Sequence, residues 1–367
     1  MTFTELGLNP DILKAIQEQG YTKPTPIQEQ AIPIVLQKHD ILAAAQTGTG
    51  KTAAFGIPLL HKIDPKRKVI QGLILCPTRE LGQQIAKQLF KFTKYSDKIF
   101  TEAVFGGPQI EKQISALKRP THIVVATPGR LIDLVKRKAL DLSHVKTIIL
   151  DEADEMMSMG FKDELDEILS FSSKVDNKWL FSATMPHEIK NIVNTHMSEA
   201  VKIEVSGKNV VNKNIEHQYI VCEDLEKLNI LMRFLNEQGE NRGLIFCKTK
   251  VATQKLAQQL QSRNVPVDAI HGDLLQKERD KAMRAFKNES LKVLVATDLA
   301  ARGIDVANLA YVIHYQMPDK IDYYTHRAGR TARAGNKGVS ICIVNSKELK
   351  QIRYISEKLG ITFEQIR

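Results

Sequence analysis

Short apolar runs alternate with longer helix-like stretches along the whole chain. Clear examples of the apolar runs are residues 72–76, 123–126, 147–150, 244–247 and 293–296. Runs this short and apolar on both faces are typical of parallel strands buried inside a sheet. The stretches between them are long enough to supply the crossover helices that parallel strands need. The pattern therefore predicts an α/β fold.

The two halves of the chain resemble each other. Residues 72–79 correspond to residues 243–250 at an offset of 171, and residues 125–127 correspond to residues 295–297 at an offset of 170. A period this long indicates two copies of a domain rather than a solenoid of short repeats. We therefore expect two tandem α/β domains, each a mostly parallel sheet with helices on both faces.

A polar, turn-prone stretch separates the two copies. It covers residues 206–214 and contains Ser206, Gly207 and three asparagines. Such composition is typical of a linker. The expected organisation is domain 1 at residues 1–205, the linker at 206–214 and domain 2 at 215–367.

Composition narrows the class of protein. Hydrophobic residues make up 43% and charged residues 26%, a balance that suits a globular protein and not a disordered one. No apolar run approaches the roughly 20 residues that span a bilayer, and the N-terminus does not resemble a secretory signal. None of the four cysteines forms a Cys-x-x-Cys pair. We expect a reducing, cytoplasmic location.

The net charge of +10 is unevenly distributed. Residues 207–367 carry 26 Lys+Arg against 18 Asp+Glu, whereas residues 1–206 carry 26 against 24. An excess of positive charge attracts a polyanion such as nucleic acid. Solubility alone would also explain it, so charge leaves both explanations open.

A glycine-rich segment in the first half has the features of a phosphate-binding loop. It follows the apolar pair at residues 41–42 and precedes a helix-like stretch. Glycines let backbone N–H groups face phosphates, Lys51 would reach the β- and γ-phosphates, and the Thr52 hydroxyl would bind Mg²⁺. The segment expected to bind the nucleotide is Ala45, Gln46, Thr47, Gly48, Thr49, Gly50, Lys51 and Thr52. Ala45 stands where the strict pattern has glycine, and the alternative is an ordinary Gly-rich turn.

An acidic cluster follows the apolar run at residues 147–150. Its members are Asp151, Glu152 and Asp154. At the end of a buried strand downstream of a phosphate-binding loop, Asp151 would hold Mg²⁺ and Glu152 would orient or deprotonate the attacking water. The alternative is a solvated helix N-terminus, where carboxylates are favoured in any case.

The second half has no Gly-Lys-Thr sequence and instead carries a basic segment at residues 326–333. If this segment is helical, Arg327, Arg330 and Arg333 lie near one face. A solvated basic helix is the simpler alternative. A copy with arginines but no phosphate loop suggests that one domain binds ATP and the other presents arginine fingers to it.

These motifs, in this order, resemble those of the DEAD-box RNA helicases across almost the whole chain. The resemblance rests on residues 20–28, 77–81, 106–107, 127–130, 151–154 and 182–184 in the first half and on residues 271–273, 276–279, 296–305 and 326–333 in the second. The resemblance implies that the two domains are tandem RecA-like domains, and the chain is most similar to the bacterial RhlE-type branch. Ala328 and Ala332 depart from the family pattern, which more often has a branched apolar residue and a glycine there.

The resemblance implies roles for individual residues. Gln28 and Phe3 would bind the adenine, Asp305 the ribose, and Arg330 and Arg333 would be the arginine fingers. His326 would link its motif to domain 1, and Ser182, Thr184 and Asp154 would couple the nucleotide site to RNA. The residues expected to bind RNA are Pro77, Thr78, Arg79, Gly107, Thr127, Gly129, Arg130, Thr249, Gly272, Gln276, Arg279, Thr297 and Arg302.

The function expected from this set is that of an RNA-dependent ATPase using ATP and Mg²⁺. It would locally unwind short RNA duplexes or remodel RNA–protein complexes through ATP-driven closure of two domains. Threonine, glycine and arginine contacts suit the sugar–phosphate backbone, so little sequence specificity is expected for its single-stranded or short duplex RNA. The alternatives are an ATP-dependent RNA clamp without productive unwinding and a DNA helicase of the same superfamily.

Overall fold

The computed structural model describes residues 2–45, 48–107, 109–171, 175–205, 212–301, 309–332 and 336–366. The chain divides into two compact units, Met1–Ser206 and Gly207–Arg367, which we call domain 1 and domain 2. The boundary between them falls inside the stretch expected to be the linker.

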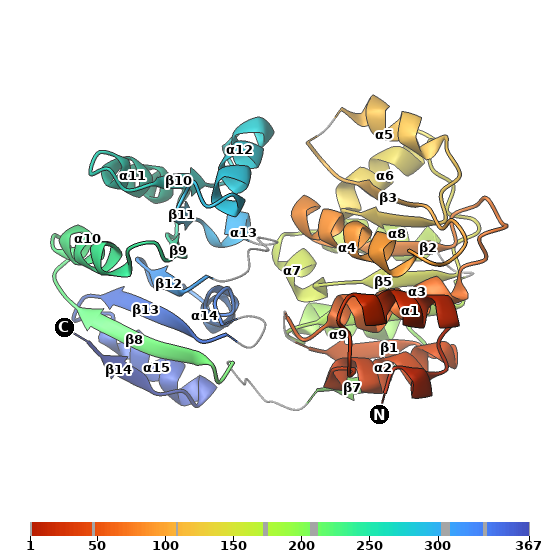
Figure 1. Cartoon of the computed structure of the whole chain (residues 1–367), viewed down its shortest axis with the longest axis horizontal. Coiled ribbons are helices and arrows are strands. Elements are labelled where there is room, and N and C mark those ends of the chain that lie inside the picture. The colour runs from red at the N-terminus through yellow and green to blue at the C-terminus, as the bar shows by residue number, and fades with distance from the viewer. Residues whose placement is uncertain are drawn as a thin grey trace. The chain divides into compact units, whose positions relative to one another are not determined.

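Domain 1 alternates strands and helices (Figure 1). Its elements are a 3-10 helix (Thr4–Leu6), α1 (Pro10–Glu18), α2 (Pro26–Leu36), β1 (Ile41–Ala44), α3 (Lys51–Lys62), β2 (Gly72–Leu75), α4 (Arg79–Phe92), β3 (Thr101–Val104), α5 (Ile110–Leu117), β4 (Ile123–Ala126), α6 (Pro128–Lys136), β5 (Thr147–Leu150), α7 (Ala153–Ser158), α8 (Lys162–Phe171), β6 (Asn177–Ser182), α9 (His187–His196) and β7 (Val201–Glu204).

The described strands of domain 1 form one sheet in the order β3-β4-β2-β5-β6-β1-β7. Each pairing recorded between them is parallel. Buried side chains pack on both faces of this sheet, one set around Phe55, Phe92 and Trp179 and the other around Leu131, Ile148 and Met156. Burial on both faces explains why β2, β4 and β5 are continuous apolar runs rather than alternating ones.

Domain 2 repeats this arrangement. Its elements are β8 (Ile215–Val221), α10 (Lys227–Gln238), β9 (Gly243–Phe246), α11 (Lys250–Gln261), β10 (Val267–Ile270), α12 (Gln276–Lys287), β11 (Val293–Ala296), α13 (Asp298–Ala301), β12 (Tyr311–His314), α14 (Ile321–Ala328), β13 (Gly338–Val344), α15 (Leu349–Leu359) and β14 (Phe363–Gln365). The described strands are ordered β10-β11-β9-β12-β13-β8-β14 and pair in parallel.

The two sheet orders confirm the duplication seen in the sequence. Position by position, β2 corresponds to β9, β4 to β11 and β5 to β12. The equivalent helices even begin in the same way: Thr78 Oγ1 accepts a hydrogen bond from Leu81 N at the start of α4, and Thr249 Oγ1 accepts one from Ala252 N at the start of α11. Such N-caps stabilise a helix by about 1 kcal/mol each. The predicted fold of two tandem RecA-like domains is confirmed.

Candidate nucleotide and RNA sites

The sequence motifs of domain 1 lie at the carboxyl ends of its strands and form two groups there. The phosphate-binding segment follows β1, the acidic cluster follows β5, and Ser182 ends β6, which lies between β1 and β5 in the sheet. The motifs expected to bind RNA follow β2, β3 and β4, which occupy the other half. Ligand sites in parallel α/β sheets lie at this edge.

The loop between β1 and α3 has a backbone that only glycine adopts without strain. Gly48 has φ +86° and Gly50, the residue before α3, has φ +94°. A Cβ on Gly50 would also collide with Nε2 of Gln28. These two glycines let the loop turn tightly into the N-terminus of α3, whose first N–H groups and positive dipole end favour a phosphate.

Lys51 is poised for an anion. Its side chain is 6% exposed, and Nζ has no hydrogen-bond acceptor among the residues that the structure describes. The nearest carboxylate oxygen, Oδ1 of Asp151, is 3.9 Å away. A buried ammonium group without an acceptor is costly, and a phosphate group would supply the missing oxygens. This feature fits the expected nucleotide.

Asp151 and Glu152 lie at the end of β5 in a buried setting. The pKa of Asp151 is raised to about 6, chiefly by burial and also by the neighbouring Glu152, although Lys51 and a hydrogen bond from the backbone N–H of Glu152 act to lower it. Glu152 has φ +53°, a left-handed conformation that costs an ordinary residue about 1–2 kcal/mol. Strained backbone of this kind is often found where a side chain must be aimed.

The donor set also fits a magnesium ion. Mg²⁺ is usually held by one or two carboxylates together with substrate phosphates and water. Thr52, on the first turn of α3, and Asp151 would supply a hydroxyl and one carboxylate. Within the described ranges there is no cluster of three or more His, Cys, Asp or Glu side chains that could hold a metal without such a substrate.

The three residues expected to couple the sites are joined by hydrogen bonds. Both the backbone N–H and the hydroxyl of Thr184 donate to Oδ2 of Asp154, each at 2.8 Å. Ser182 Oγ accepts from the backbone N–H of Asp154 at 3.2 Å and donates to the carbonyl of Thr184 at 2.7 Å. The end of β6 and the start of α7 are thereby fixed to each other.

Gln28 and Phe3 both lie in the N-terminal part of domain 1. The Gln28 side chain is 2% exposed and bridges two segments: Nε2 donates to the carbonyl of Gly50 at 3.0 Å, and Oε1 accepts from Thr25 N at 3.0 Å. Gln28 therefore touches the phosphate-binding loop directly. Phe3 is 5% exposed, with its ring edge-on to Tyr21. Its stacking on adenine stays a prediction.

The expected RNA contacts of domain 1 lie together at the ends of β2, β3 and β4. Thr78 caps α4, the Arg79 guanidinium lies 5.0 Å from the Phe105 ring, and Gly107 has φ +99°. A Cβ added to Gly129 would meet no atom within 4 Å, so this turn has an open surface. Pro77, Thr127 and Arg130 complete the group, with Arg130 Nε 4.0 Å from Asp133.

The expected RNA contacts of domain 2 occupy the equivalent edge, after β9, β10 and β11. Thr249 caps α11, and Thr297 Oγ1 accepts from Ala300 N. Gly272 precedes α12, where Gln276 Nε2 donates to Asp280 and an Arg279 nitrogen donates to the carbonyl of Ala300. The duplicated fold thus places Thr249 and Thr297 at the positions of Thr78 and Thr127, with Gly and Arg residues near them in each domain.

The basic segment corrects one expectation. The α14 helix ends at Ala328, so Arg330 follows the helix and does not share a helical face with Arg327. Gly329 ends the helix, and Arg330 Nε donates to the carbonyl of His326 at 3.3 Å. The spacing of the arginines is helical, but after Ala328 the chain continues in tight turns, with the backbone N–H of Arg330 donating to the carbonyl of Arg327 at 3.0 Å.

Arg327 has a role that the sequence did not reveal. It is 1% exposed and makes a two-pronged ion pair with Asp298, at 2.5 and 2.7 Å, as well as a bond to the carbonyl of Gln316. The pair joins α14 to α13 inside domain 2. The sequence signal available was the Thr-Asp that follows β11, but nothing linked it to Arg327.

Five of the expected site residues lie outside the described residues: Gln46, Thr47, Arg302, Asp305 and Arg333. Their roles stay predictions.

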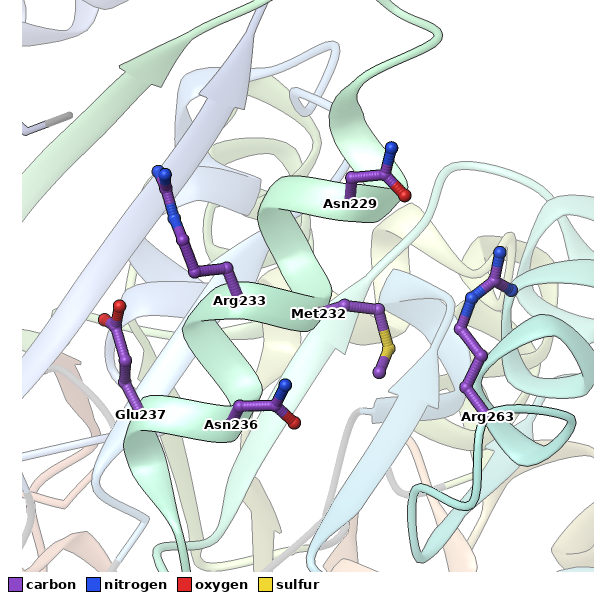
Figure 2. A pocket seen from close by; sticks show the side chains of 6 residues that line it. All are labelled: Asn229, Met232, Arg233, Asn236, Glu237 and Arg263. Atoms are coloured by element: carbon purple, nitrogen blue, oxygen red, sulfur yellow. The ribbon is translucent and has the colours of Figure 1, made fainter.

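One groove lies away from all these motifs. It has a volume of about 570 Å³ and is lined by Asn229, Met232, Arg233, Asn236, Glu237 and Arg263. Figure 2 shows it along α10, with the side chain of Met232 directed towards the side of Arg263. None of the expected site residues lines this groove, so we do not assign it to ATP or RNA.

Comparison with known families identifies the class of protein. A family model described as DEAD/DEAH box helicase matches residues 25–192, and one described as helicase conserved C-terminal domain matches residues 226–335. Curated relatives cover nearly the whole chain at 40–43% identity. The chain belongs to the DEAD-box family of ATP-dependent RNA helicases.

The relatives carry one particular name. The CshA helicase of Geobacillus kaustophilus (strain HTA426) is 40% identical over 366 residues, covering 100% of this chain and 78% of its own length. The CshA helicase of Limosilactobacillus reuteri is 43% identical over 360 residues, covering 98% and 72%. These names do not support the expected RhlE-type branch.

Solved structures agree with the fold. Saccharomyces cerevisiae Dbp5 bound to RNA and ADP BeF3 has a TM-score of 0.90 at 30% identity, covering 100% of this chain and 95% of that one. Mss116p bound to single-stranded RNA and AMP-PNP has a TM-score of 0.89 at 28% identity, covering 100% and 80%. In the part of this chain that the structure describes, no helix is long and apolar enough to cross a membrane.

Proposed function

We propose that this protein is an RNA-dependent ATPase that separates short RNA duplexes, or remodels RNA–protein complexes, by closing its two domains on ATP and RNA. The observation that carries this proposal is the buried Lys51 ammonium, which lacks a hydrogen-bond acceptor among the described residues, beside Asp151 and Glu152. Relatives that cover 96% or more of the chain are ATP-dependent RNA helicases.

The phosphate chemistry is assigned to four residues. Lys51 would neutralise the β- and γ-phosphates, and Thr52 and Asp151 would hold a magnesium ion that offsets the charge of those phosphates. Glu152 would orient the attacking water and accept its proton. The loop from Ala45 to Gly50 would wrap the phosphates with backbone N–H groups, and its glycine conformations support this role.

Recognition of the base and sugar is assigned to residues on both domains. Gln28 would bind the adenine, and its contact with Gly50 would report whether the phosphate loop is occupied. Phe3 would stack on the adenine and Asp305 would bind the ribose. Arg330 and Arg333 would stabilise the charge that develops on the γ-phosphate, and His326 would hold their motif against domain 1.

RNA would bind at the carboxyl ends of β2, β3 and β4 in domain 1 and of the equivalent strands β9, β10 and β11 in domain 2. The Thr, Gly and Arg residues placed there suit phosphates and 2′-hydroxyls, so the protein should read little base sequence. Asp154, Ser182 and Thr184 would transmit the state of the nucleotide to this edge, since hydrogen bonds join them directly. Because ATP and RNA would both favour the closed form, each should tighten the binding of the other equally.

Two expectations from the sequence complete the proposal. Domain 1 would end at residue 205 and domain 2 would begin at residue 215. The cytoplasmic location rests on the sequence alone.

One experiment tests the proposed function. Steady-state ATP turnover would be measured with no nucleic acid, with a single-stranded RNA and with the DNA of the same sequence. We expect strong stimulation by RNA and little by DNA, because the contacts read the 2′-hydroxyl. Equal stimulation by both would favour a DNA helicase of the same superfamily.

A further inference from the structure

The end of the domain 1 sheet opposite the nucleotide and RNA motifs carries a concentration of positive charge. The loops there precede β2, β3, β4 and β5, which are adjacent in the sheet order β3-β4-β2-β5. We define the basic edge as these four loops, residues 63–71, 93–100, 118–122 and 137–146. They hold ten Lys+Arg and three Asp+Glu, although residues 1–206 as a whole are nearly balanced at 26 against 24.

Backbone hydrogen bonds join these loops into one surface. The backbone N–H of Gln71 donates to the carbonyl of His122 at 2.8 Å, and the N–H of Lys146 donates to the carbonyl of Gln71 at 2.8 Å. The N–H of His122 in turn donates to the carbonyl of Phe100 at 2.9 Å. Neighbouring strands lie about 4.8 Å apart, so the surface from β3 to β5 is roughly 14 Å wide.

The loop at residues 63–71 is built to present three consecutive cations. The buried Gln71 side chain closes it: Oε1 accepts from Asp64 N at 3.0 Å, and Nε2 donates to the carbonyls of Asp64 and Arg67 at 2.8 and 3.2 Å. Lys66, Arg67 and Lys68 project from this closed loop, and all three are exposed.

Acidic neighbours neutralise only part of this charge. Four of the ten cations are paired: Lys94 with Glu18, Arg119 with Glu102, Arg137 with Asp133 and Lys146 with Asp176. Within the described parts of the chain the other six have no ion pair, and they are Lys66, Arg67, Lys68, Lys98, Lys118 and Lys138.

An exposed aromatic ring belongs to the same surface. Phe100 is 45% exposed, and its ring is stacked on the buried His122 ring with centroids 5.8 Å apart and planes at 12°. His122 is held by hydrogen bonds to Phe100 N and to the carbonyl of Pro65. A fixed, exposed ring among cations suits single-stranded nucleic acid, whose bases stack on aromatic faces while its phosphates meet the cations.

We infer that the basic edge is a second RNA-binding surface. It holds the single-stranded flank of a long RNA, while another part of the same RNA is bound at the carboxyl ends of β2, β3 and β4, where the RNA motifs lie. This inference rests on the proposed function. The two surfaces lie at opposite ends of the strands, and the buried sheet with the side chains packed on both of its faces separates them, so an RNA must pass around the domain to occupy both. The contribution is therefore to the affinity for long RNA and not to turnover.

The test combines a charge reversal with RNAs of two lengths. The triple variant Lys66→Glu/Arg67→Glu/Lys68→Glu would be compared with wild type using single-stranded RNAs of about ten and about fifty nucleotides. For the long RNA we expect the concentration giving half-maximal ATPase stimulation to rise about tenfold or more, with a shallower salt dependence of binding. For the short RNA both this concentration and kcat should be unchanged.

Two further variants make the result specific. Phe100→Ala should weaken binding of the long RNA while leaving its salt dependence intact, because stacking involves no charge. The matched control Lys347→Glu/Lys350→Glu/Arg353→Glu reverses three exposed cations on α15 and just before it in domain 2, and it should behave as wild type.

The outcomes separate this inference from the proposed function. If RNA of either length fails to stimulate the wild type, the proposed function is wrong. If the wild type is stimulated but the Lys66 triple variant binds both RNAs as tightly as wild type, the basic edge does not bind RNA. Equal weakening for the short RNA or by the α15 control would also overturn it, because the effect would then be one of net charge.

Discussion

At the scale of single residues, the nucleotide site depends on side chains that are costly on their own. The buried Lys51 has its nearest carboxylate at 3.9 Å, and Glu152 sits in a left-handed conformation. Both costs become understandable if a triphosphate and a water molecule complete the site. Substitutions of these two residues therefore test which of them is needed for ATP binding and which for ATP hydrolysis.

Replacing Glu152 separates ATP binding from hydrolysis. In Glu152→Gln the amide keeps the size of the side chain but loses the ability to accept a proton, so turnover should fall by about 10²–10⁴-fold. ATP affinity should change little, because Lys51 and the phosphate loop are intact. Lys51→Ala should instead weaken binding itself. The measurements are single-turnover hydrolysis and equilibrium binding of a fluorescent ATP analogue. Near-normal turnover of Glu152→Gln would remove it from the water-activating role.

The residues of the nucleotide site could be predicted from the sequence more readily than other features. A Gly-Lys-Thr after a strand and an acidic cluster after another strand define chemistry that needs few structural details. Arg327 was missed for the opposite reason: its importance comes from a buried pair with Asp298, 29 residues away in sequence, and only the fold shows that they meet. Ala332, where the family more often has glycine, has φ +55°, which explains that preference.

At the scale of elements, the start of α7 and the end of β6 form one unit. Two hydrogen bonds from Thr184 end on a single oxygen of Asp154, and Ser182 bonds to both segments. A shift of the acidic cluster when the nucleotide changes would therefore move the end of β6 with it. This link is the physical basis for the proposed coupling.

Removing one hydroxyl should loosen that link without dismantling the nucleotide site. Thr184→Val is nearly the same size but loses the hydroxyl's bond to Asp154 and keeps only that of the backbone N–H, whereas Thr184→Ser keeps both. We expect Thr184→Val to retain RNA-stimulated ATP turnover within a few-fold while duplex separation falls about tenfold, since one lost charge-assisted bond costs about 1.5–3 kcal/mol. Both activities would be measured on the same short duplex. Wild-type unwinding by Thr184→Val would show that the bond does not couple them.

Domain 2 contains a buried polar chain that should make it sensitive to acid. Tyr324 Oη lies 2.5 Å from His217 Nδ1 and 3.3 Å from Ser340 Oγ, which is 3.0 Å from His314 Nε2. Burial lowers the pKa of His217 to about 4, and burial, Arg327 and His217 lower that of His314 as well. Both imidazoles are therefore neutral in the folded domain at physiological pH.

The sign of the pH effect follows from this shift. An unfolded histidine titrates near pH 6.5, so below that pH the unfolded chain binds more protons and stability is lost as pH falls towards 4. Between about pH 7.5 and about pH 5 His217 alone should cost about 2 kcal/mol of unfolding free energy. Denaturant unfolding at both values measures it. His217→Gln should reduce the loss, and the exposed His144→Gln should not; an identical loss in both variants would exclude His217 as the cause.

Elements were predictable where periodicity was strong and less so at their ends. The buried strands β2, β4, β5, β9 and β11 lie within one residue of their apolar runs. The short strand β14 was not expected, because it has three residues with little apolar pattern and gains its stability by pairing with β8. The end of α14 was missed because helical spacing of arginines outweighed the glycine between them.

At the scale of the whole molecule, duplication followed by specialisation explains the distribution of motifs. The acidic cluster follows β5 in domain 1, and α14 with the basic segment at residues 326–333 follows β12, the equivalent strand in domain 2. The same position in two copies of one fold thus holds the groups that would bind metal in one and the cations that would meet phosphate in the other. The sequence already placed the acidic cluster in one half and the arginines in the other, but whether both act in ATP hydrolysis needs a functional test.

Arg330 provides that test, because it belongs to the domain without a phosphate-binding loop. It is 8% exposed and bonds to the carbonyl of His326, so its placement is fixed within domain 2. An arginine finger acts on charge that develops in the transition state, and its loss costs about 10³–10⁵ in kcat with little change in ATP affinity. We expect this pattern for Arg330→Ala at saturating RNA, whereas the exposed Arg353→Ala on α15 should match wild type. A thermal melt of both variants would establish that domain 2 is intact. If Arg330→Ala raised KM for ATP and left kcat unchanged, the residue would bind ATP without promoting hydrolysis, and catalysis would belong to domain 1 alone.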